Sequence, residues 1–215
     1  MPIRMILIVL TFLSLPSRGT ANLIQNGSFE SPSTIPGSFC TVGIAIPPTC
    51  ASALDVWSAP YILGNGGGGL YGQPVPVPDG AQFLILQGNN GGTNMSQTVN
   101  LPSTGNYLLT WYDSGRFDGG TFGGNQTYEL HLDGIAVGSS STVDSQPWTF
   151  QSRSFFANAG LYTFSIVPLA TTDETAFLDN FVLVAENGNS EVPEPASAAI
   201  LALGLAAIVT LRRRG

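Results

Sequence analysis

The sequence contains no lysine. Its 215 residues include seven arginines and fourteen acidic residues, and five of the arginines lie near the two ends, at Arg4, Arg18 and 212–214. Between those ends only Arg116 and Arg153 are positive, so this central part carries fourteen minus two, or twelve, net negative charges. Such a surface repels phosphate backbones and anionic lipid headgroups. This charge argues against nucleic-acid binding and favours divalent cations or neutral polymers as partners.

Histidine is almost absent too. The single histidine, His131, alternates with Glu129 and Asp133 in "YELHLD", on the polar side of an expected strand, which is typical of a solvated residue. A metal-binding patch is the alternative. No GxSxG, HExxH or Cys-His arrangement occurs, so nucleophilic and zinc hydrolysis lack their usual parts. A carboxylate pair for glycoside hydrolysis stays open, because spacing in sequence does not fix separation in space. We expect no enzymatic activity.

Long hydrophobic runs occur only at the two ends. Residues 1–21 combine Arg4, the apolar segment "MILIVLTFLSL" and the small-residue exit "GTA", which is the pattern of a secretory signal peptide cleaved after Ala21. Residues 196–211 are uncharged and precede three arginines. As a helix they would span about 24 Å, slightly less than the roughly 30 Å hydrocarbon core of a bilayer. We predict a transmembrane helix, with a buried core helix as the alternative.

The arginines after this run set its orientation. Positive residues stay on the cytoplasmic side of the membrane, so the chain before the helix is expected outside the cell. In an exported chain, Cys40 and Cys50 of "CTVGIAIPPTC" are most simply a disulfide that closes a surface loop and contributes roughly 3 kcal/mol. A metal or redox pair is the alternative, but neither a CxxC spacing nor a neighbouring histidine supports it.

The central part of the chain has the pattern of a β protein. No stretch reads as a long amphipathic helix, and about 160 residues suffice for one domain. Short β-branched or aromatic segments are separated by Gly, Asp, Asn or Pro. The predicted strands cover 23–26, 54–58, 81–88, 95–101, 106–113, 127–134, 135–139, 148–157, 160–169 and 176–185. Strands without intervening helices favour a single all-β sandwich.

Turn and loop signals complete this organisation. Asp133-Gly134 supplies the positive φ that a tight hairpin needs. The Gly-rich tracts 64–72 and 114–125 are predicted as loops, since neither leads from a strand into a helix. The sequence thus predicts a signal peptide (1–21), a β-sandwich domain (22–185), a linker (186–191) and a C-terminal segment (192–215) with its helix at 196–211.

The C-terminal segment has three parts in order: a Pro-Glu-Pro stop, an apolar run and an arginine cluster. The motif residues are Val192, Pro193, Glu194, Pro195, Arg212, Arg213 and Arg214. These parts resemble the PEP-CTERM sorting signal of Gram-negative bacteria. The resemblance implies that an exosortase, a membrane enzyme similar to cysteine transpeptidases, processes the segment. It also implies an inner-membrane-anchored intermediate and a final place on the cell surface or in an extracellular, biofilm-type matrix.

Two segments at the ends of the domain carry a second resemblance. "NLIQNGSFESP" (22–32) and the last strand "AFLDNFVLV" (176–184), with the strands between them, look like galactose-binding-domain-like jelly rolls, many of which are carbohydrate-binding modules. In that superfamily the first and last strands lie together and often hold a structural calcium. Glu30 and Asp179 match the two positions, although Asn180 stands where a second acid is usual. The alternative is that both carboxylates accept backbone hydrogen bonds.

Aromatic side chains supply candidates for a sugar site. Flat rings bind the apolar side of a sugar, and Asn, Gln, Asp and Arg bind its hydroxyls. We single out Trp57, Tyr112 and Arg116, while noting that most aromatic residues are core residues. In "NYLLTWYD", Trp111 and Tyr112 point to opposite faces, so at least one of them is buried.

These features predict an exported, non-catalytic protein that binds or coats extracellular polysaccharide and is sorted by an exosortase. The expected partners are the exosortase, polysaccharide and, before processing, the membrane, with calcium as a structural ion. The alternative is a structural or protein-interaction surface protein without a sugar site.

Overall fold

The computed structural model describes residues 21–43, 48–50, 56–58, 61–66, 75–88, 95–117 and 125–186. The predicted signal peptide up to residue 20, the linker from residue 187 and the predicted membrane helix lie outside the described residues. Within the described ranges, no helix has the length and apolar character needed to cross a membrane.

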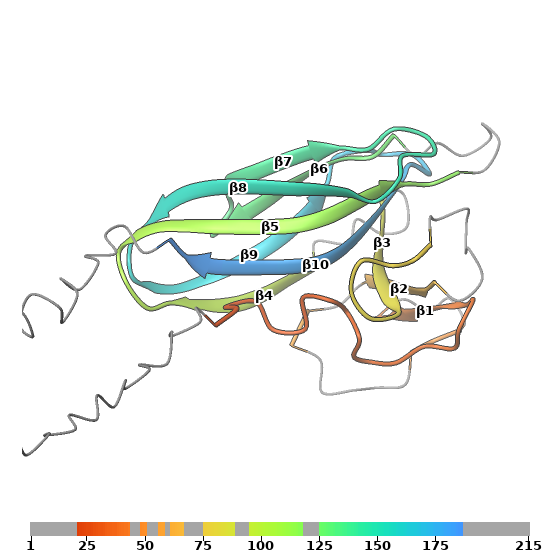
Figure 1. Cartoon of the computed structure of the whole chain (residues 1–215), viewed down its shortest axis with the longest axis horizontal. Helices are drawn as coiled ribbons and strands as arrows, with labels where there is room; N and C mark the ends of the chain where they lie inside the picture. The colour runs from red at the N-terminus through yellow and green to blue at the C-terminus, as the bar shows by residue number, and fades with distance from the viewer. Residues whose placement is uncertain are drawn as a thin grey trace, which may run out of the picture.

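Antiparallel β-strands make up the fold (Figure 1). In the described residues they are β1 Phe39–Val42, β2 Tyr61–Asn65, β3 Gln82–Gln87, β4 Met95–Leu101, β5 Gly105–Gly115, β6 Thr127–Leu132, β7 Ile135–Ser141, β8 Thr149–Ala157, β9 Gly160–Pro168 and β10 Thr175–Ala185. One sheet has the order β1-β2-β3-β10-β5-β8, and the other has the order β4-β9-β6-β7.

The last eight strands are nested like one long folded hairpin. β6 and β7 form its tip, and β5 pairs with β8, β4 with β9 and β3 with β10. Each successive pair alternates between the two sheets, which is the jelly-roll arrangement. The predicted all-β jelly-roll sandwich is confirmed, and β1 and β2 extend its larger sheet beyond β3.

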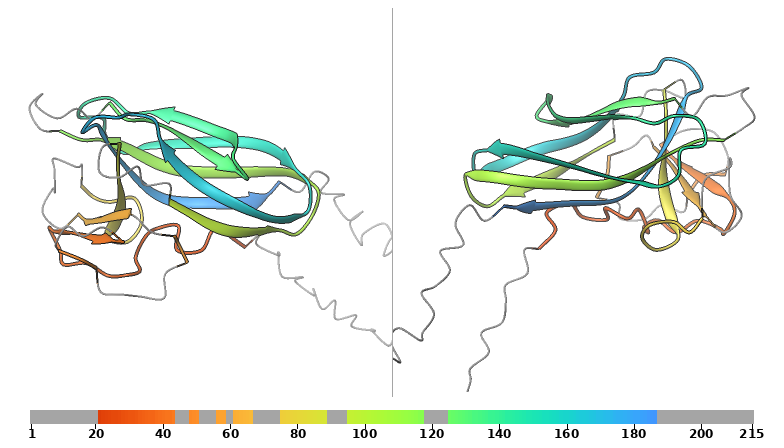
Figure 2. Two further views of the ribbon diagram at one scale, coloured as in Figure 1. Left: turned by 180° about the vertical axis from the view of Figure 1, so that it is seen from behind. Right: turned by 45° about the horizontal axis from the view of Figure 1, so that its top comes forward.

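Figure 2 shows the two layers of strands from two further directions. An aromatic core fills the space between them. Trp111 of β5 lies parallel to Phe181 of β10, with ring centroids 6.0 Å apart and an interplanar angle of 4°. Phe164 of β9 packs edge-on against the same Phe181. Alternation explains why the strands form here: in β4 every second residue is buried, which places its apolar row against this core.

The hairpin at the tip agrees with the sequence. Asp133 and Gly134 have φ values of 48° and 79°, the left-handed pair that a two-residue turn between right-twisted strands requires. Tyr128, Leu130 and Leu132 are buried on the core side of β6, as the alternation predicted.

One predicted strand is wrong, and a second forms no strand in its described part. Residues 23–26 form turns, because Asn26 has a φ of 49° and its side chain bonds the backbone of Ser31. This segment still lies beside β10, since the Leu23 amide donates to the Leu183 carbonyl at 2.9 Å. Of residues 54–58, the described part (56–58) makes only an isolated bridge between Ser58 and Ser96.

The structure adds two strands that the sequence did not indicate, β1 and β2. All five residues of β2 are buried, so it lacks the alternation by which a strand is recognised. Its Gly64 belongs to a tract predicted as a loop, but the Phe83 ring of β3 occupies the space where a Cβ would stand. Ser114 and Gly115, from the second Gly-rich tract, likewise extend β5.

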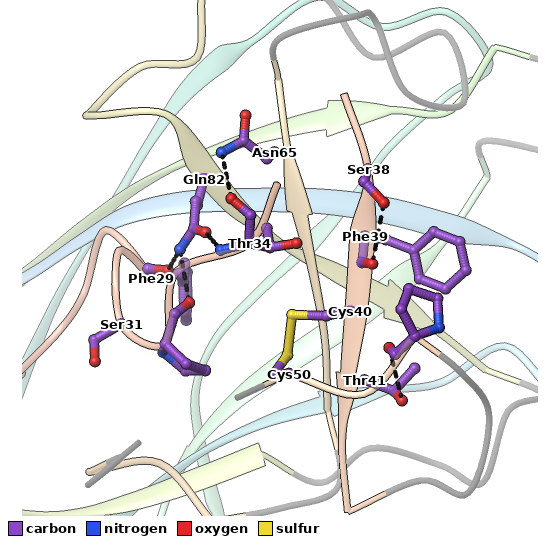
Figure 3. Close-up of a disulfide and its surroundings, with 12 residues drawn as sticks. Phe29, Ser31, Thr34, Ser38, Phe39, Cys40, Thr41, Cys50, Asn65 and Gln82 are labelled. Carbon is purple, nitrogen blue, oxygen red and sulfur yellow. Dashed lines mark hydrogen bonds between the residues drawn. A yellow bond between two sulfur atoms is a disulfide. The ribbon is translucent and has the colours of Figure 1, made fainter. Parts of the chain in front are cut away.

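The predicted disulfide between Cys40 and Cys50 is present (Figure 3). It fastens the segment around Cys50 to β1, where the Thr41 amide donates to the Pro48 carbonyl and the Cys50 amide to the Thr41 carbonyl, both at 2.9 Å. Figure 3 also shows Gln82 of β3, whose side-chain amide donates to the carbonyls of Phe29 (2.6 Å) and Pro32 (3.0 Å). These bonds hold the N-terminal segment against the larger sheet.

Candidate functional site

The outer face of the larger sheet has a covered half and an open half. A second apolar cluster of Ile62, Phe83, Ile85 and Phe177 lies on the side away from the main core, and Val77 and Trp148 pack over it. Over β8, β5 and the second half of β10 no described segment crosses the sheet, and Figure 1 looks onto this open half. We call the outward side chains of these three strands the open face.

Two phenylalanines of β8 stand on the open face. Phe150 and Phe156 are 56% and 67% exposed, although large apolar side chains usually avoid water. They are six residues apart, so they point to the same side and are separated by about 20 Å along the strand. The face therefore presents one ring near each end of β8.

Neighbouring strands complete the face at the Phe150 end. Tyr112 of β5 stands opposite Phe150, with ring centroids 5.3 Å apart and an interplanar angle of 66°. Between the two phenylalanines the face carries hydroxyls: Ser152 lies opposite Thr110, and Ser154 lies opposite Leu108. Aromatic rings with hydroxyl groups between them can stack on sugar rings and exchange hydrogen bonds with their hydroxyl groups.

The other end of the face is hollowed. A depression of about 260 Å³ is lined by Ser103, Thr104, Gly105, Asn106, Phe156, Ala185 and Glu186. Asn106 stands opposite Phe156 in the register of β5 and β8. The Glu186 amide donates to the Asn106 carbonyl at 2.8 Å, and the Ser154 hydroxyl donates to Glu186 Oε1 at 2.7 Å. The Glu186 carboxylate thus lies across β5, beside the exposed Phe156 ring.

The smaller sheet offers a different outer surface. Its partly exposed residues include His131, whose Nε2 lies 2.8 Å from Glu129 Oε2, and Ser165 beside His131 in the register of β6 and β9. Asp133 turns away, since its Oδ1 accepts the Thr163 amide at 2.7 Å. Among the described residues, no three His, Cys, Asp or Glu side chains are grouped so that they could hold a metal ion.

Trp57, predicted in the sugar site, lies in the core. It is 4% exposed, its ring packs against Phe29 and Phe164, and its indole N–H donates to the Asn26 carbonyl at 3.1 Å. The sequence contained no signal for this position, since the described residues 56–58 make only an isolated bridge.

The other two predicted sugar-site residues are separated. Tyr112 is half-buried on the open face, while its neighbour Trp111 is buried, which resolves the alternative left by the alternation. Arg116 is 7% exposed and reaches Asp173 Oδ1 at 3.4 Å, at the end of the sandwich where β5 leaves the sheet. The structure therefore joins Tyr112 with Phe150 and places Arg116 in an ion pair.

A buried carboxylate lies behind the open face. Asp113 of β5 is fully buried and accepts hydrogen bonds from four side chains: Tyr128 and Ser140 at 2.8 Å, Gln146 at 2.7 Å and Gln151 at 3.2 Å. Burial, followed by the charge of Asp113, raises the pKa of Tyr128 well above its usual value. Because the donors come from β6, β7, β8 and the connection between β7 and β8, this group ties these strands to β5.

Glu30 and Asp179, the predicted calcium ligands, both contact the segment 79–82. Glu30 Oε1 accepts the amides of Ala81 and Gln82 at 2.7 Å, and Asp179 Oδ2 accepts the Asp79 amide at 2.9 Å. Burial, together with the charges of Asp79 and Glu30, raises the pKa of Asp179 to about 8, against the lowering effect of its backbone bonds. Both carboxylates thus accept backbone hydrogen bonds, as the alternative to a calcium site expected, and Asp179 is fully buried.

Comparison with known proteins identifies the C-terminal segment. Residues 191–214 match the family model described as a PEP-CTERM protein-sorting motif, which confirms the resemblance noted in the sequence. A comparison with curated proteins finds no match.

Solved structures with similar strand arrangements include carbohydrate-binding modules. TmCBM61 in complex with beta-1,4-galactotriose is 13% identical with a TM-score of 0.43, over 78% of this chain and 100% of that one. The C-terminal CBM6 of the laminarinase LamC from Zobellia galactanivorans is 23% identical with a TM-score of 0.39, over 53% of this chain and 87% of that one. A family 35 module from Clostridium thermocellum is 19% identical with a TM-score of 0.37, over 50% and 80%. At these scores the likeness carries no argument about function.

Proposed function

We propose that this protein is exported and binds extracellular polysaccharide through the open face, without catalysing a reaction. An exosortase processes its PEP-CTERM segment and delivers it to the surface or matrix of a Gram-negative cell. The observation that carries the binding role is the pair of exposed rings, Phe150 and Phe156, on one side of β8 with Ser152 and Ser154 between them.

The spacing of the rings suits an extended polymer. A separation of about 20 Å along β8 lets one chain lie on the strand with sugar rings against both phenylalanines. The intervening serine and threonine hydroxyls each donate and accept hydrogen bonds, as sugar hydroxyls do.

Charge restricts the polymer. Of the two arginines in the described residues, Arg116 pairs with Asp173, and Arg153 donates to the carbonyls of Ser139 and Ser152. Both arginines therefore bond to groups of the protein itself and not to a ligand on the open face. The protein as a whole is acidic. We expect neutral or cationic polysaccharides rather than polyuronic acids or sulfated chains.

A calcium ion is a second part of the proposal. Glu30 and Asp179, which both contact segment 79–82, would hold it, and calcium accepts such carboxylates with backbone carbonyls as its remaining ligands. The placement of both residues at segment 79–82 supports this, since a cation stabilises the ionised form of a buried carboxyl such as Asp179, whose pKa is raised chiefly by burial. The role of the ion is structural: it would join the N-terminal segment to β10.

Retention of the full chain, purified in mild detergent, on immobilised polysaccharides tests the binding role. We expect Phe150→Ala and Phe156→Ala each to weaken retention three- to tenfold, about what one lost ring contact costs. Leu161→Ala is the matched control, because Leu161 is 71% exposed and lies on β9 of the other sheet. Equal retention of all variants, or none by the wild type, would leave the structural or protein-interaction role as the better account.

A further inference from the structure

We propose that the hollow at the end of the open face binds a saccharide unit that carries a protonated amine, with Glu186 as the acceptor of the ammonium group. This inference rests on the proposed polysaccharide binding and specifies its chemistry. It makes the ligand an amino-sugar polymer whose amines are free rather than acylated.

The hollow has the size and walls for one sugar ring. Its volume of about 260 Å³ lies just below the roughly 300–1,000 Å³ of pockets that enclose drug-sized ligands. The Phe156 ring, 67% exposed, forms an apolar wall, and Asn106 and the Ser103–Gly105 turn form a polar one. A sugar has one apolar and several polar sides, so it matches a wall of each kind.

Glu186 supplies the charge. Ser154 bonds one of its oxygens, Oε1, and this bond fixes the carboxylate over β5. Among the described residues, Arg116 pairs with Asp173 and His131 contacts Glu129, so neither side chain is a partner of Glu186. An ammonium group would form a charge-assisted hydrogen bond with Oε2, which is stronger than the bond of a neutral hydroxyl.

The surroundings of Glu186 favour a free ammonium group over an acylated amine or a uronic acid. Arg153 lies next to Ser154 on β8. It donates to the carbonyl of Ser152 on the same strand and to that of Ser139 on β7. An acylated amine is neutral and bulkier, and a uronic acid would meet Glu186 as a like charge. The free amine is therefore the sugar substituent that this hollow selects.

Two tetrasaccharides isolate the amine. The β-1,4-linked glucosamine tetramer and the N-acetylglucosamine tetramer share one backbone and differ in acylation, and their affinities for the full chain in mild detergent can be measured by calorimetry. We expect the glucosamine tetramer to bind about tenfold more tightly. The preference should shrink as salt is raised, because the hollow is open to solvent.

Substitutions assign the preference to Glu186. Glu186→Gln should abolish it while leaving the weaker binding of the acetylated tetramer unchanged. Asp144→Asn removes the same charge from an exposed residue in the β7–β8 connection, at the opposite end of β8 from Phe156, and should keep the preference. If Asp144→Asn reduces it as much as Glu186→Gln, the attraction is to the net charge and the inference is overturned.

Failure of this inference can be distinguished from failure of the proposed function. Equal binding of both tetramers, or preference for the acetylated one, overturns the amine specificity but leaves polysaccharide binding if Phe150→Ala still weakens it. If neither tetramer binds, the amine site is refuted. The proposed function then stands only if another polysaccharide is retained through Phe150 and Phe156.

Discussion

Glu30 and Asp179 accept backbone hydrogen bonds from the same short segment, although one lies near the start of the domain and the other in its last strand. Ala81 and Gln82 donate to Glu30, and Asp79 donates to Asp179. The 79–82 segment therefore couples the N-terminal turns to β10. Small changes in this segment should alter the free energy of unfolding of the whole domain.

Gly80→Ala should destabilise the protein by about 2–3 kcal/mol. Gly80 has a φ of 67°, and a Cβ there would collide with the Glu30 carboxylate. Urea unfolding of the two proteins measures the difference. Gly134→Ala is the matched control: its φ is 79° but its Cβ would meet open space, so only about 1 kcal/mol should be lost. Equal losses would show that the carboxylate moves aside freely.

The stability of the protein in chelator should fall as pH rises from about 4 to 8. Asp179 has a folded-state pKa of about 8 against an ordinary value of 3.8, so the folded protein keeps a proton that the unfolded chain has lost. The stabilisation is complete below pH 3.8 and lost as pH rises towards 8. Melting temperatures across this range should show a slope that Asp179→Asn flattens. An unchanged slope in the variant would assign the pH dependence to other groups.

Calcium should raise the melting temperature at pH 8, where the Asp179 carboxylate gives up its proton. A ligand at one hundred times its Kd stabilises the folded state by about 2.7 kcal/mol. Differential scanning calorimetry with calcium and with chelator measures this. The gain should disappear in Glu30→Gln and persist in Glu129→Gln, an acid of the other sheet. No gain in the wild type would refute the calcium site.

Asp113→Ala should cost about 3–5 kcal/mol. The change leaves four buried or partly buried donors from Tyr128, Ser140, Gln146 and Gln151 without their shared acceptor. Ser152→Ala, on the exposed side of the adjacent strand, should change stability by less than about 0.5 kcal/mol. Denaturant unfolding compares them. A loss below about 1 kcal/mol in Asp113→Ala would mean that water replaces the carboxylate.

Local patterns in the sequence were sufficient to predict strands β3 to β10. Alternation, β-branched residues and turn signals such as Asp133-Gly134 act over a few residues, and the nested jelly roll follows once these strands pair. β2 escaped prediction because burial on both faces removes alternation, and because Gly64 is required by the distant Phe83 ring.

The open face was predicted only in part, for a related reason. In β8 the outward row of Phe150, Ser152, Ser154 and Phe156 and the inward row of Gln151, Arg153 and Phe155 both mix polar and apolar residues. The pattern cannot show which row meets water. Gln151 faces inward because Asp113 accepts its amide, and Arg153 because Ser139 offers a carbonyl. These partners lie far away in the sequence, so only the folded chain reveals them.

The position of β10 bears on how the protein withstands pulling. β10 lies between β3 and β5 in the middle of the larger sheet, and the residues that lead to the sorting motif follow it directly. If the chain is held through that segment while its ligand is dragged by flow, tension runs along β10. The ladder hydrogen bonds are perpendicular to the strand, so this tension shears them together rather than opening them one by one. If the proposed function holds, the central position of β10 makes the domain resistant to tension applied between its C-terminal segment and a polymer on the open face.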